Sequence, residues 1–308
     1  MSEPRGGTEL QLDLLKKHID SDILDHFQIC TSIPNKAPRD PEKINILWQK
    51  NNYNQPNILP WFLNKNNYDQ YDWYVFNSHW SAEKYRKMFS LPHDRCHVIK
   101  NAIENFPTRS SYKKGDTVKL IFQPTPWRGL NVLLGAMDLL KNENIILDVY
   151  SSCDLYGSNF AKRNKKDWEI LFDQARALPN VNYIGNRSNA FILDNLKNYH
   201  MFAYPSIWEE TSCISAIECM SAGLFTITTN YGALYETCAD FPIYVNFNKD
   251  VKKLAHQFAY AIKSASAQLD QEHVQHHLDK QQDYFKYFYS WEKRKIQWTN
   301  FLSGAINV

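Results

Sequence analysis

The chain has 308 residues, a formal net charge of +2 and 22% charged side chains. This length accommodates two α/β domains of ordinary size, and the near balance of charge gives no electrostatic reason to expect a nucleic-acid partner. No run of apolar residues reaches the length of about 18 that a membrane span needs, and the N-terminus lacks the apolar core of a signal peptide.

Six cysteines are scattered along the sequence without a C-x-x-C pair. This spacing argues against a zinc site or a disulfide framework and fits a reducing compartment. We therefore expect a cytoplasmic protein without a metal site. Peripheral contact with a membrane and the oligomeric state stay open.

The first hundred residues predict a helix and then a series of short strands. The paired glycines Gly6 and Gly7 precede the amphipathic helix 10–19, and such a pair lets the backbone approach a ligand closely, although it also makes plain turns. The one D-x-D triplet, at 20–22, follows this helix rather than a strand, so we interpret it as a turn and cap. The expected strands are 27–30, 44–49, 72–78 and 96–101.

A polar, aperiodic stretch, 107–117, is expected to link this half to a second one. A final aromatic amphipathic helix is expected within 283–304. The short connections around the helix expected at 211–222 predict a parallel βαβ unit. The strands expected in this half lie at 118–123, at 145–152, at 201–206 and at 224–229.

Two carboxylates, Glu210 and Glu218, frame the helix expected at 211–222 and are separated by seven residues. Eight helical positions span roughly 12 Å, which suits a ligand of two joined pieces. The free N–H groups at a helix start bind phosphate, and the small residues at 211–213 leave them accessible. A nucleotide sugar has this layout of a central anion and hydroxyl-bearing ends. The alternative is that Glu210 merely caps the helix and Glu218 is exposed.

The segment 204–236 resembles the E-x7-E signature of the retaining glycosyltransferases of family 4, which have the GT-B fold. Thr211-Ser212-Cys213 stands where the family has Gly-Phe-Gly. The resemblance implies an α/β protein of two Rossmann-like parallel-sheet domains that face each other across a cleft. Their expected extents are 1–106, reduced and completed by the C-terminal helix 284–308, and 107–283. The matching residues are Pro205, Ser206, Glu210, Glu218, Met220, Gly223, Gly232 and Glu236.

The same resemblance assigns roles to individual residues. It implies that Glu210 contacts the donor sugar and Glu218 the ribose hydroxyls, while Arg128 holds the donor diphosphate, with Glu210 and Arg128 as the catalytic residues. The family often has a further arginine where this chain has Gln123 or the Thr125 loop, a charge that Arg5 could supply. A histidine near the reacting sugar in many relatives is missing after strand 44–49. Lys50 there is interpreted as a solvated lysine and receives no catalytic role. The implied donor-binding set is Gly6, Gly7, Thr125, Arg128, Asn186, Arg187, Glu210, Thr211, Ser212, Cys213 and Glu218, with Asn186 and Arg187 near the base.

The activity implied by the resemblance is transfer of a hexosyl group from a UDP- or GDP-sugar to an acceptor hydroxyl, with retention and without a metal or other cofactor. The acceptor is a glycan, a lipid-linked or a small molecule. Two alternatives remain. One is a nucleotide- or glycan-binding GT-B protein that has lost catalysis, and the other is another GT-B enzyme such as a sugar-nucleotide epimerase. The sequence specifies neither the base, nor the sugar, nor the acceptor.

Overall fold

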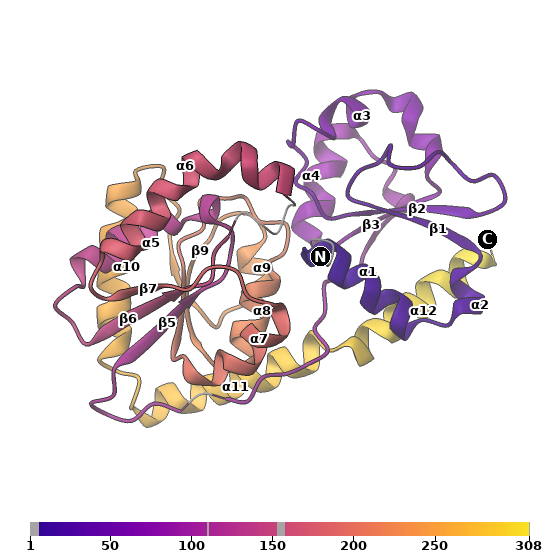
Figure 1. Ribbon diagram of the computed structural model, residues 1–308. Helices are drawn as coiled ribbons and strands as arrows, with labels where there is room; N and C mark the ends of the chain where they lie inside the picture. Colours follow the sequence, from indigo (N-terminus) through magenta and orange to yellow (C-terminus); the bar gives the residue numbers. More distant parts are fainter. Residues whose placement is uncertain (1–5, 110, 153–157, 308) are drawn as a thin grey trace. The chain divides into compact units, whose positions relative to one another are not determined.

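The computed structural model describes residues 6–109, 111–152 and 158–307, the stretch 158–167 by its backbone alone (Figure 1). The chain divides into two compact units. The N-terminal unit comprises Gly6–Glu104, Glu210–Ser212 and Tyr289–Val308, and the C-terminal unit comprises Asn105–Glu209 and Cys213–Phe288. None of the helices in the described part is long and apolar enough to cross a membrane.

The N-terminal unit is built on a parallel sheet in which the strands follow one another in sequence order. Helices α1 (Gly7–His18) and α2 (Ser21–Leu24) precede the sheet, and Asp20 caps α2 by accepting a hydrogen bond from the Asp22 N–H, as expected for this triplet. The strands confirm the sequence prediction: β1 (Phe27–Thr31), β2 (Ile44–Gln49), β3 (Trp73–Phe76) and β4 (Cys96–Val98).

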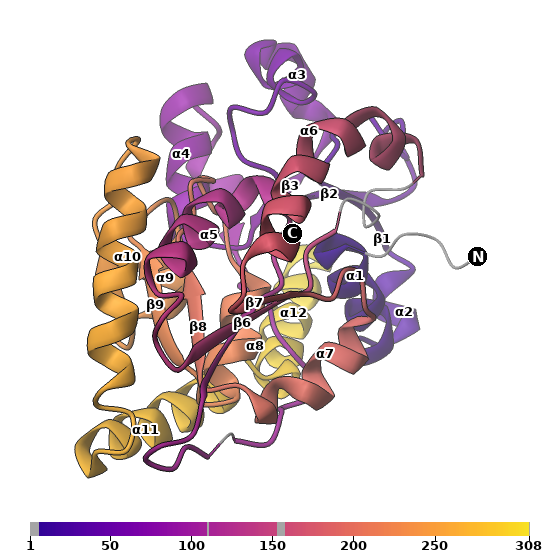
Figure 2. The same cartoon turned by 60° about the vertical axis from the view of Figure 1, so that its left-hand side comes forward.

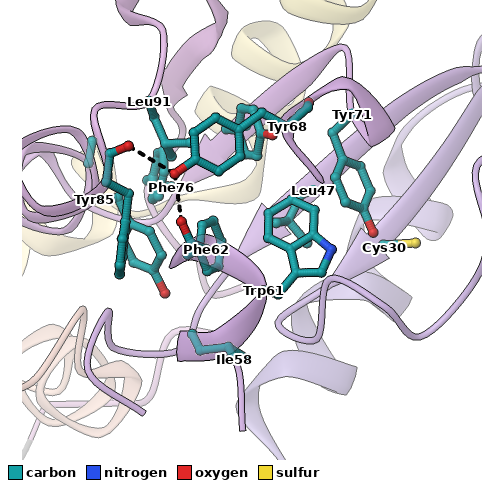
Figure 3. Packing of buried hydrophobic residues seen from close by; sticks show 13 residues of the cluster. Cys30, Leu47, Ile58, Trp61, Phe62, Tyr68, Tyr71, Phe76, Tyr85 and Leu91 are labelled. Carbon is teal, nitrogen blue, oxygen red and sulfur yellow. Dashed lines mark hydrogen bonds between the residues drawn. The ribbon is translucent and has the colours of Figure 1, made fainter. Parts of the chain in front are cut away.

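Each face of this sheet has its own apolar cluster. On one face, α3 (Leu59–Leu63) and α4 (His79–Phe89) enclose an aromatic cluster (Figure 3). The buried Tyr68 hydroxyl there lies 2.7 and 2.8 Å from the carbonyl oxygens of Phe62 and Phe89, which share its one proton. The other cluster joins α1, the sheet and α12 (Trp291–Ile306), with Trp48 and Trp298 edge to face at 4.8 Å between ring centroids. Residues far apart in the sequence therefore share one core.

The C-terminal unit contains a second parallel sheet, in the order β10-β9-β8-β5-β6-β7. The chain runs outward from β5 through β6 to β7 and then returns to β8 on the other side of β5. In open α/β sheets a ligand binds at the carboxyl ends of the strands where the order reverses in this way, here between β5 and β8. The strands are β5 (Val118–Phe122), β6 (Ile145–Val149), β7 (Val181–Tyr183), β8 (Met201–Tyr204), β9 (Phe225–Thr229) and β10 (Ile243–Val245).

Helices cover both faces of this sheet. The helices α5 and α10 pack side by side over one face, and α8 and α11 pack together over the other (Figures 1 and 2). The expected α/β class with parallel sheets is confirmed. The helices are α5 (Leu130–Leu139), α6 (Ser158–Ala177), α7 (Asn189–Asn195), α8 (Ile214–Ser221), α9 (Leu234–Cys238), α10 (Val251–Ser266) and α11 (Glu272–Phe288).

The single terminal helix expected within 283–304 is wrong. The chain forms α11, breaks at Tyr289 and Ser290, and begins α12 at Trp291. Ser290 is the N-cap, and its Oγ accepts a hydrogen bond from the Lys293 N–H at 3.3 Å. A serine that caps a new helix offers the backbone an alternative to continuing the old one. The aromatic periodicity runs through this break and conceals it.

Candidate functional site

Gly129 lets the loop after β5 approach the end of β8. Its φ is +118°, and a Cβ at this position would lie only 2.2 Å from the Pro205 carbonyl oxygen. Glycine alone tolerates both the backbone conformation and the close approach. Gly129 is also the N-cap of α5, so the first amides of this helix begin at the point where the strand order reverses. Arg128 immediately precedes it.

The side chains of the loop between β5 and α5 are shaped by local contacts. The Arg128 N–H donates to the Thr125 carbonyl oxygen at 3.1 Å, and the guanidinium carbon lies 5.7 Å from the centre of the Trp208 ring. Thr125 is buried, and its Oγ1 has no hydrogen-bond partner among the atoms that the structure describes. Buried hydroxyls are almost always paired, so Thr125 is a candidate to contact a ligand.

Glu218 is the main buried carboxylate of the C-terminal unit, with only 3% of its surface exposed. One carboxylate oxygen accepts a hydrogen bond from Asn189 Nδ2 at 2.8 Å, and the other accepts one from Gln123 Nε2 at 3.4 Å. Burial raises the pKa of this carboxyl from 4.5 to about 7, against the lowering effect of the two amides. The alternative in which Glu218 is merely exposed is therefore wrong.

The expected helix start at Thr211 is also wrong. Helix α8 begins at Ile214, with Cys213 as its N-cap, and the first intrahelical hydrogen bond runs from the Ile217 N–H to the Cys213 carbonyl oxygen at 3.1 Å. Thr211 and Ser212 belong to the N-terminal unit instead. The amides at a helix start on this segment are therefore those of 214–216.

Glu210 lies outside α8 and does not cap it. The spacing of roughly 12 Å between Glu210 and Glu218 presupposed that both are helical, so it does not apply. Glu210 is 2% exposed. The small residues at 211–213 do not form one helix start, because the side chains of Thr211 and Ser212 form hydrogen bonds within the N-terminal unit.

Asn186 and Arg187, expected near the base, are exposed, and the Arg187 Nη1 atom donates to the neighbouring carbonyl oxygen of Asn186 at 2.7 Å. Asn189 contacts Glu218 instead, and the sequence interpretation did not single it out. Ser188 caps α7 by accepting from the Phe191 N–H, which places Asn189 in the first turn. A capping serine before an apolar stretch was the available signal.

Gly6 and Gly7 mark the start of α1 in the N-terminal unit. Helix α1 begins at Gly7, and the Gly6 N–H donates to Glu9 Oε2 at 3.0 Å. The expected helix after the glycine pair is confirmed, with a start three residues earlier than the apolar pattern indicated. Arg5 lies outside the described residues.

Within the N-terminal unit, side-chain hydrogen bonds join the segment Glu210–Ser212 to residues that follow the strands of the sheet. Thr211 Oγ1 donates to the Lys50 carbonyl oxygen at 3.0 Å and accepts from Asn77 Nδ2 at 3.2 Å. Ser212 Oγ accepts from Asn101 Nδ2 at 3.1 Å. Thr211 and Ser212 therefore make specific side-chain contacts.

Lys50 is not the solvated lysine that the sequence suggested. Its Nζ donates to Asn101 Oδ1 at 2.9 Å and lies 3.8 Å from the centre of the Trp48 ring. Burial lowers the pKa of the Lys50 ammonium well below its ordinary value, although the Glu9 carboxylate acts in the opposite direction. The N-terminal unit thus carries a partly desolvated amine at the carboxyl end of β2.

A cavity of about 300 Å³ adjoins the loop that carries Arg128. Its walls include the rings of Trp127 and Trp168, whose centroids are 5.7 Å apart, together with Ile207 from the segment after β8. The cavity is mainly apolar, so it suits the flat or apolar part of a ligand.

The raised pKa of Glu218 makes a prediction for Glu218→Gln. The fold favours the neutral carboxyl, so the wild type loses stability as the pH rises from about 4.5 to about 7 and the unfolded state ionises. The loss amounts to about 3 kcal/mol at most, and glutamine avoids it. Glu218→Gln should therefore be more stable than the wild type at about pH 8 and equally stable at about pH 4.5, as measured by urea unfolding.

The exposed Glu42 offers a matched control, because Glu42→Gln should leave the free energy of unfolding nearly unchanged at both pH values. A Glu218→Gln effect of the same size at both pH values would show that folding does not raise the pKa of the Glu218 carboxyl.

Comparison with known proteins agrees with this architecture. The profile of the family described as Glycosyl transferases group 1 matches residues 104–276, more than half of the sequence. The chain therefore belongs to the Glycosyl transferases group 1 family. A search of curated proteins found no significant match.

Several solved structures share the fold at low sequence identity. A glycosyltransferase from Rickettsia africae ESF-5 is 15% identical with a TM-score of 0.68, over 99% of this chain and 84% of that one. The pneumococcal O-GlcNAc transferase GtfA, in complex with UDP and GlcNAc, is 11% identical with a TM-score of 0.67, over 97% and 60%. Anabaena Alr3699/HepE, in complex with UDP-glucose, is 14% identical with a TM-score of 0.63, over 85% and 72%. The expected GT-B fold is confirmed.

Proposed function

We propose that this chain is a retaining glycosyltransferase of family 4 with the E-x7-E signature, which transfers a hexosyl group from a UDP- or GDP-sugar to an acceptor hydroxyl. The observation that carries the proposal is the buried Glu218 with its two amide donors, in the same unit as the Arg128–Gly129 turn at the reversal of strand order. A carboxylate suits a ribose diol, and a cation next to a helix start suits a diphosphate. Family membership supports the transferase class.

In the proposed reaction, the acceptor oxygen bonds to the anomeric carbon while the bond from that carbon to the donor phosphate oxygen breaks. The leaving diphosphate gains negative charge, which the Arg128 guanidinium and the first amides of α5 stabilise electrostatically. A phosphate oxygen on the departing side accepts the acceptor's proton, which gives retention. Glu218 would bind the ribose hydroxyls and Glu210 the donor sugar. The chain supplies its catalytic charges from side chains and amides, so we propose that no metal is required.

The neighbours favour uridine as the first base to test. The pneumococcal transferase was crystallised with UDP and GlcNAc, and the Anabaena protein with UDP-glucose. We propose the same nucleotide class for this chain, with a glycan, lipid-linked or small-molecule acceptor recognised by the N-terminal unit and with cytoplasmic location.

The proposal is tested first by thermal shifts with UDP, GDP, ADP and TDP, each with EDTA and with Mn²⁺. A ligand that binds only the folded protein raises Tm by mass action. We expect one diphosphate to raise Tm by a similar amount in EDTA and in Mn²⁺. A shift that disappears in EDTA would contradict the metal-independent site, and no shift with any diphosphate would contradict the donor site.

Turnover then separates the enzyme from a binding protein that has lost catalysis. The sugar conjugates of the stabilising diphosphate are incubated with candidate acceptors, and the anomeric configuration of the product is read by NMR. A retained configuration is expected. Inversion would reject the retaining mechanism, and stable binding without release of the diphosphate would favour the degenerate binding protein.

A further inference from the structure

Three polar residues extend the apolar cluster of α1, the sheet and α12 at the carboxyl edge of the N-terminal sheet. Trp48, Val75 and Ile99 are buried members of that cluster. Lys50 and Asn77 directly follow β2 and β3, and Asn101 follows β4 in the segment that continues from Ile99. The segments that leave three neighbouring strands of the sheet thus each carry a polar side chain.

These polar residues meet the side chains of Thr211 and Ser212 in a network that we call the polar clasp. Its hydrogen bonds run from Lys50 to Asn101, from Asn101 to Ser212, from Asn77 to Thr211 and from Thr211 back to the Lys50 carbonyl oxygen, at 2.9, 3.1, 3.2 and 3.0 Å. The polar clasp consists of Lys50, Asn77, Asn101, Thr211 and Ser212.

The donor and acceptor roles in the polar clasp are fixed by chemistry. The ammonium form of lysine only donates, so with this form the Asn101 carboxamide turns its oxygen toward Lys50 and its NH₂ toward Ser212. Thr211 uses its hydroxyl both ways, since it accepts from Asn77 and donates to a backbone carbonyl. Lys50 therefore orients Asn101, and Asn101 in turn holds Ser212.

We propose that the polar clasp positions Glu210, with Lys50, Asn77 and Asn101 as positioning residues that act through Thr211 and Ser212. Thr211, the residue after Glu210, is held by two side-chain hydrogen bonds, and Ser212 is held by a third. These bonds fix the backbone on the C-terminal side of the Glu210 carboxylate. Glycines at 211 and 213 with phenylalanine at 212 would offer no such hydroxyls. The positioning of Glu210 by side-chain hydrogen bonds therefore depends on the Thr211–Ser212 pair of this chain. The consequence for catalysis rests on the proposed role of Glu210 at the donor sugar.

The desolvated amine makes Lys50 the most informative member of the polar clasp. Lys50→Met retains much of the apolar stem but removes the donor, which frees the Asn101 carboxamide to rotate. Loss of Lys50 should therefore have the same effect on residues 210–212 as loss of Asn101 itself. A merely structural lysine would not act selectively on this segment.

The test measures amide hydrogen exchange of a peptide that covers 207–213 in the full chain. We expect exchange in Asn101→Ala, Ser212→Ala and Lys50→Met to rise by about tenfold, because local opening no longer breaks these bonds. Asn101→Ala combined with Ser212→Ala should exchange no faster than either alone, because both remove the same bond. Ser212→Thr keeps a hydroxyl and should restore protection. The exposed residues Asn66 and Lys36, changed to Ala and Met, are the matched controls.

Turnover supplies the second readout. In the clasp variants kcat should fall by about 10- to 100-fold, as expected for a misplaced reacting group, while the Kd for UDP changes by less than about twofold. Unchanged exchange of 207–213 in Ser212→Ala, which stands outside the apolar core, would overturn the polar clasp even if Asn101→Ala failed to fold. A wild-type chain without turnover would overturn the proposed function. The exchange result would still show whether the polar clasp holds residues 210–212. Raised exchange with unchanged kcat would overturn the positioning of Glu210.

Discussion

Glu210→Gln is expected to lower kcat by about 100- to 1,000-fold while the Kd for UDP changes by less than about twofold. The substitution keeps the shape of the side chain and removes its charge. The Glu210 side chain is almost fully buried, so its charge would interact with a sugar hydroxyl in surroundings of low dielectric. That interaction strengthens as positive charge develops on the transferred sugar. UDP alone lacks this sugar, so its binding should not depend on the interaction. Steady-state kinetics and calorimetric titration with UDP measure the two effects.

The neighbouring Glu209 provides the control, because it is a less buried carboxylate one position earlier. Glu209→Gln should leave kcat within about threefold of the wild-type value. Equal losses in the two variants would indicate a general effect of charge in this segment. A Glu210→Gln protein with wild-type turnover would reject the assigned role.

Arg128→Ala should weaken UDP binding by about 10- to 100-fold and leave uridine binding within about twofold. Arg128 ends the short 3-10 turn before Gly129, next to the start of α5, so its guanidinium and the helix amides can hold the same diphosphate. Uridine carries the base and ribose but no phosphate, so the comparison isolates the charged part of the ligand. Titration calorimetry with both ligands measures the difference.

Arg128→Lys distinguishes charge from geometry. Lysine keeps the positive charge but cannot bind two oxygens in the plane of a guanidinium, so UDP affinity should fall between those of the wild type and Arg128→Ala. Equal losses for UDP and uridine in Arg128→Ala would mean that the substitution disturbs the β5–α5 loop as a whole, and the diphosphate role would be rejected.

Most of the fold follows from local patterns in the sequence. Short apolar and β-branched stretches predicted strands such as β5 and β9 nearly to the residue, because buried parallel strands are continuous apolar runs. The short β10 was not predicted, since three residues carry little periodicity. The break between α11 and α12 was missed because the aromatic residues continue across Ser290 and only the cap marks it.

The candidate site was less accessible to sequence reasoning. Glu218 and Arg128 follow from a motif at fixed spacing, but the partners of Glu218 come from two other segments, and no local pattern shows that Asn189 meets it. Lys50 illustrates the same limit, because distant residues determine its environment. Its position after a strand suggested solvent, while its environment is set by residues 51 positions away, at Asn101, and 161 positions away, at Thr211. Contacts of that kind depend on topology.

The shared core of α1, the N-terminal sheet and α12 has a consequence for synthesis of the protein on the ribosome. The strands of this unit are complete by Val98, yet their apolar face is covered by Trp298 and Leu302, which are made only after the whole C-terminal unit. At typical elongation rates the delay is roughly 10 to 40 s. The earlier residues therefore wait with an open apolar face while the whole C-terminal unit is made and can fold first. Chaperones that bind apolar surface would have their longest opportunity on this half of the nascent chain.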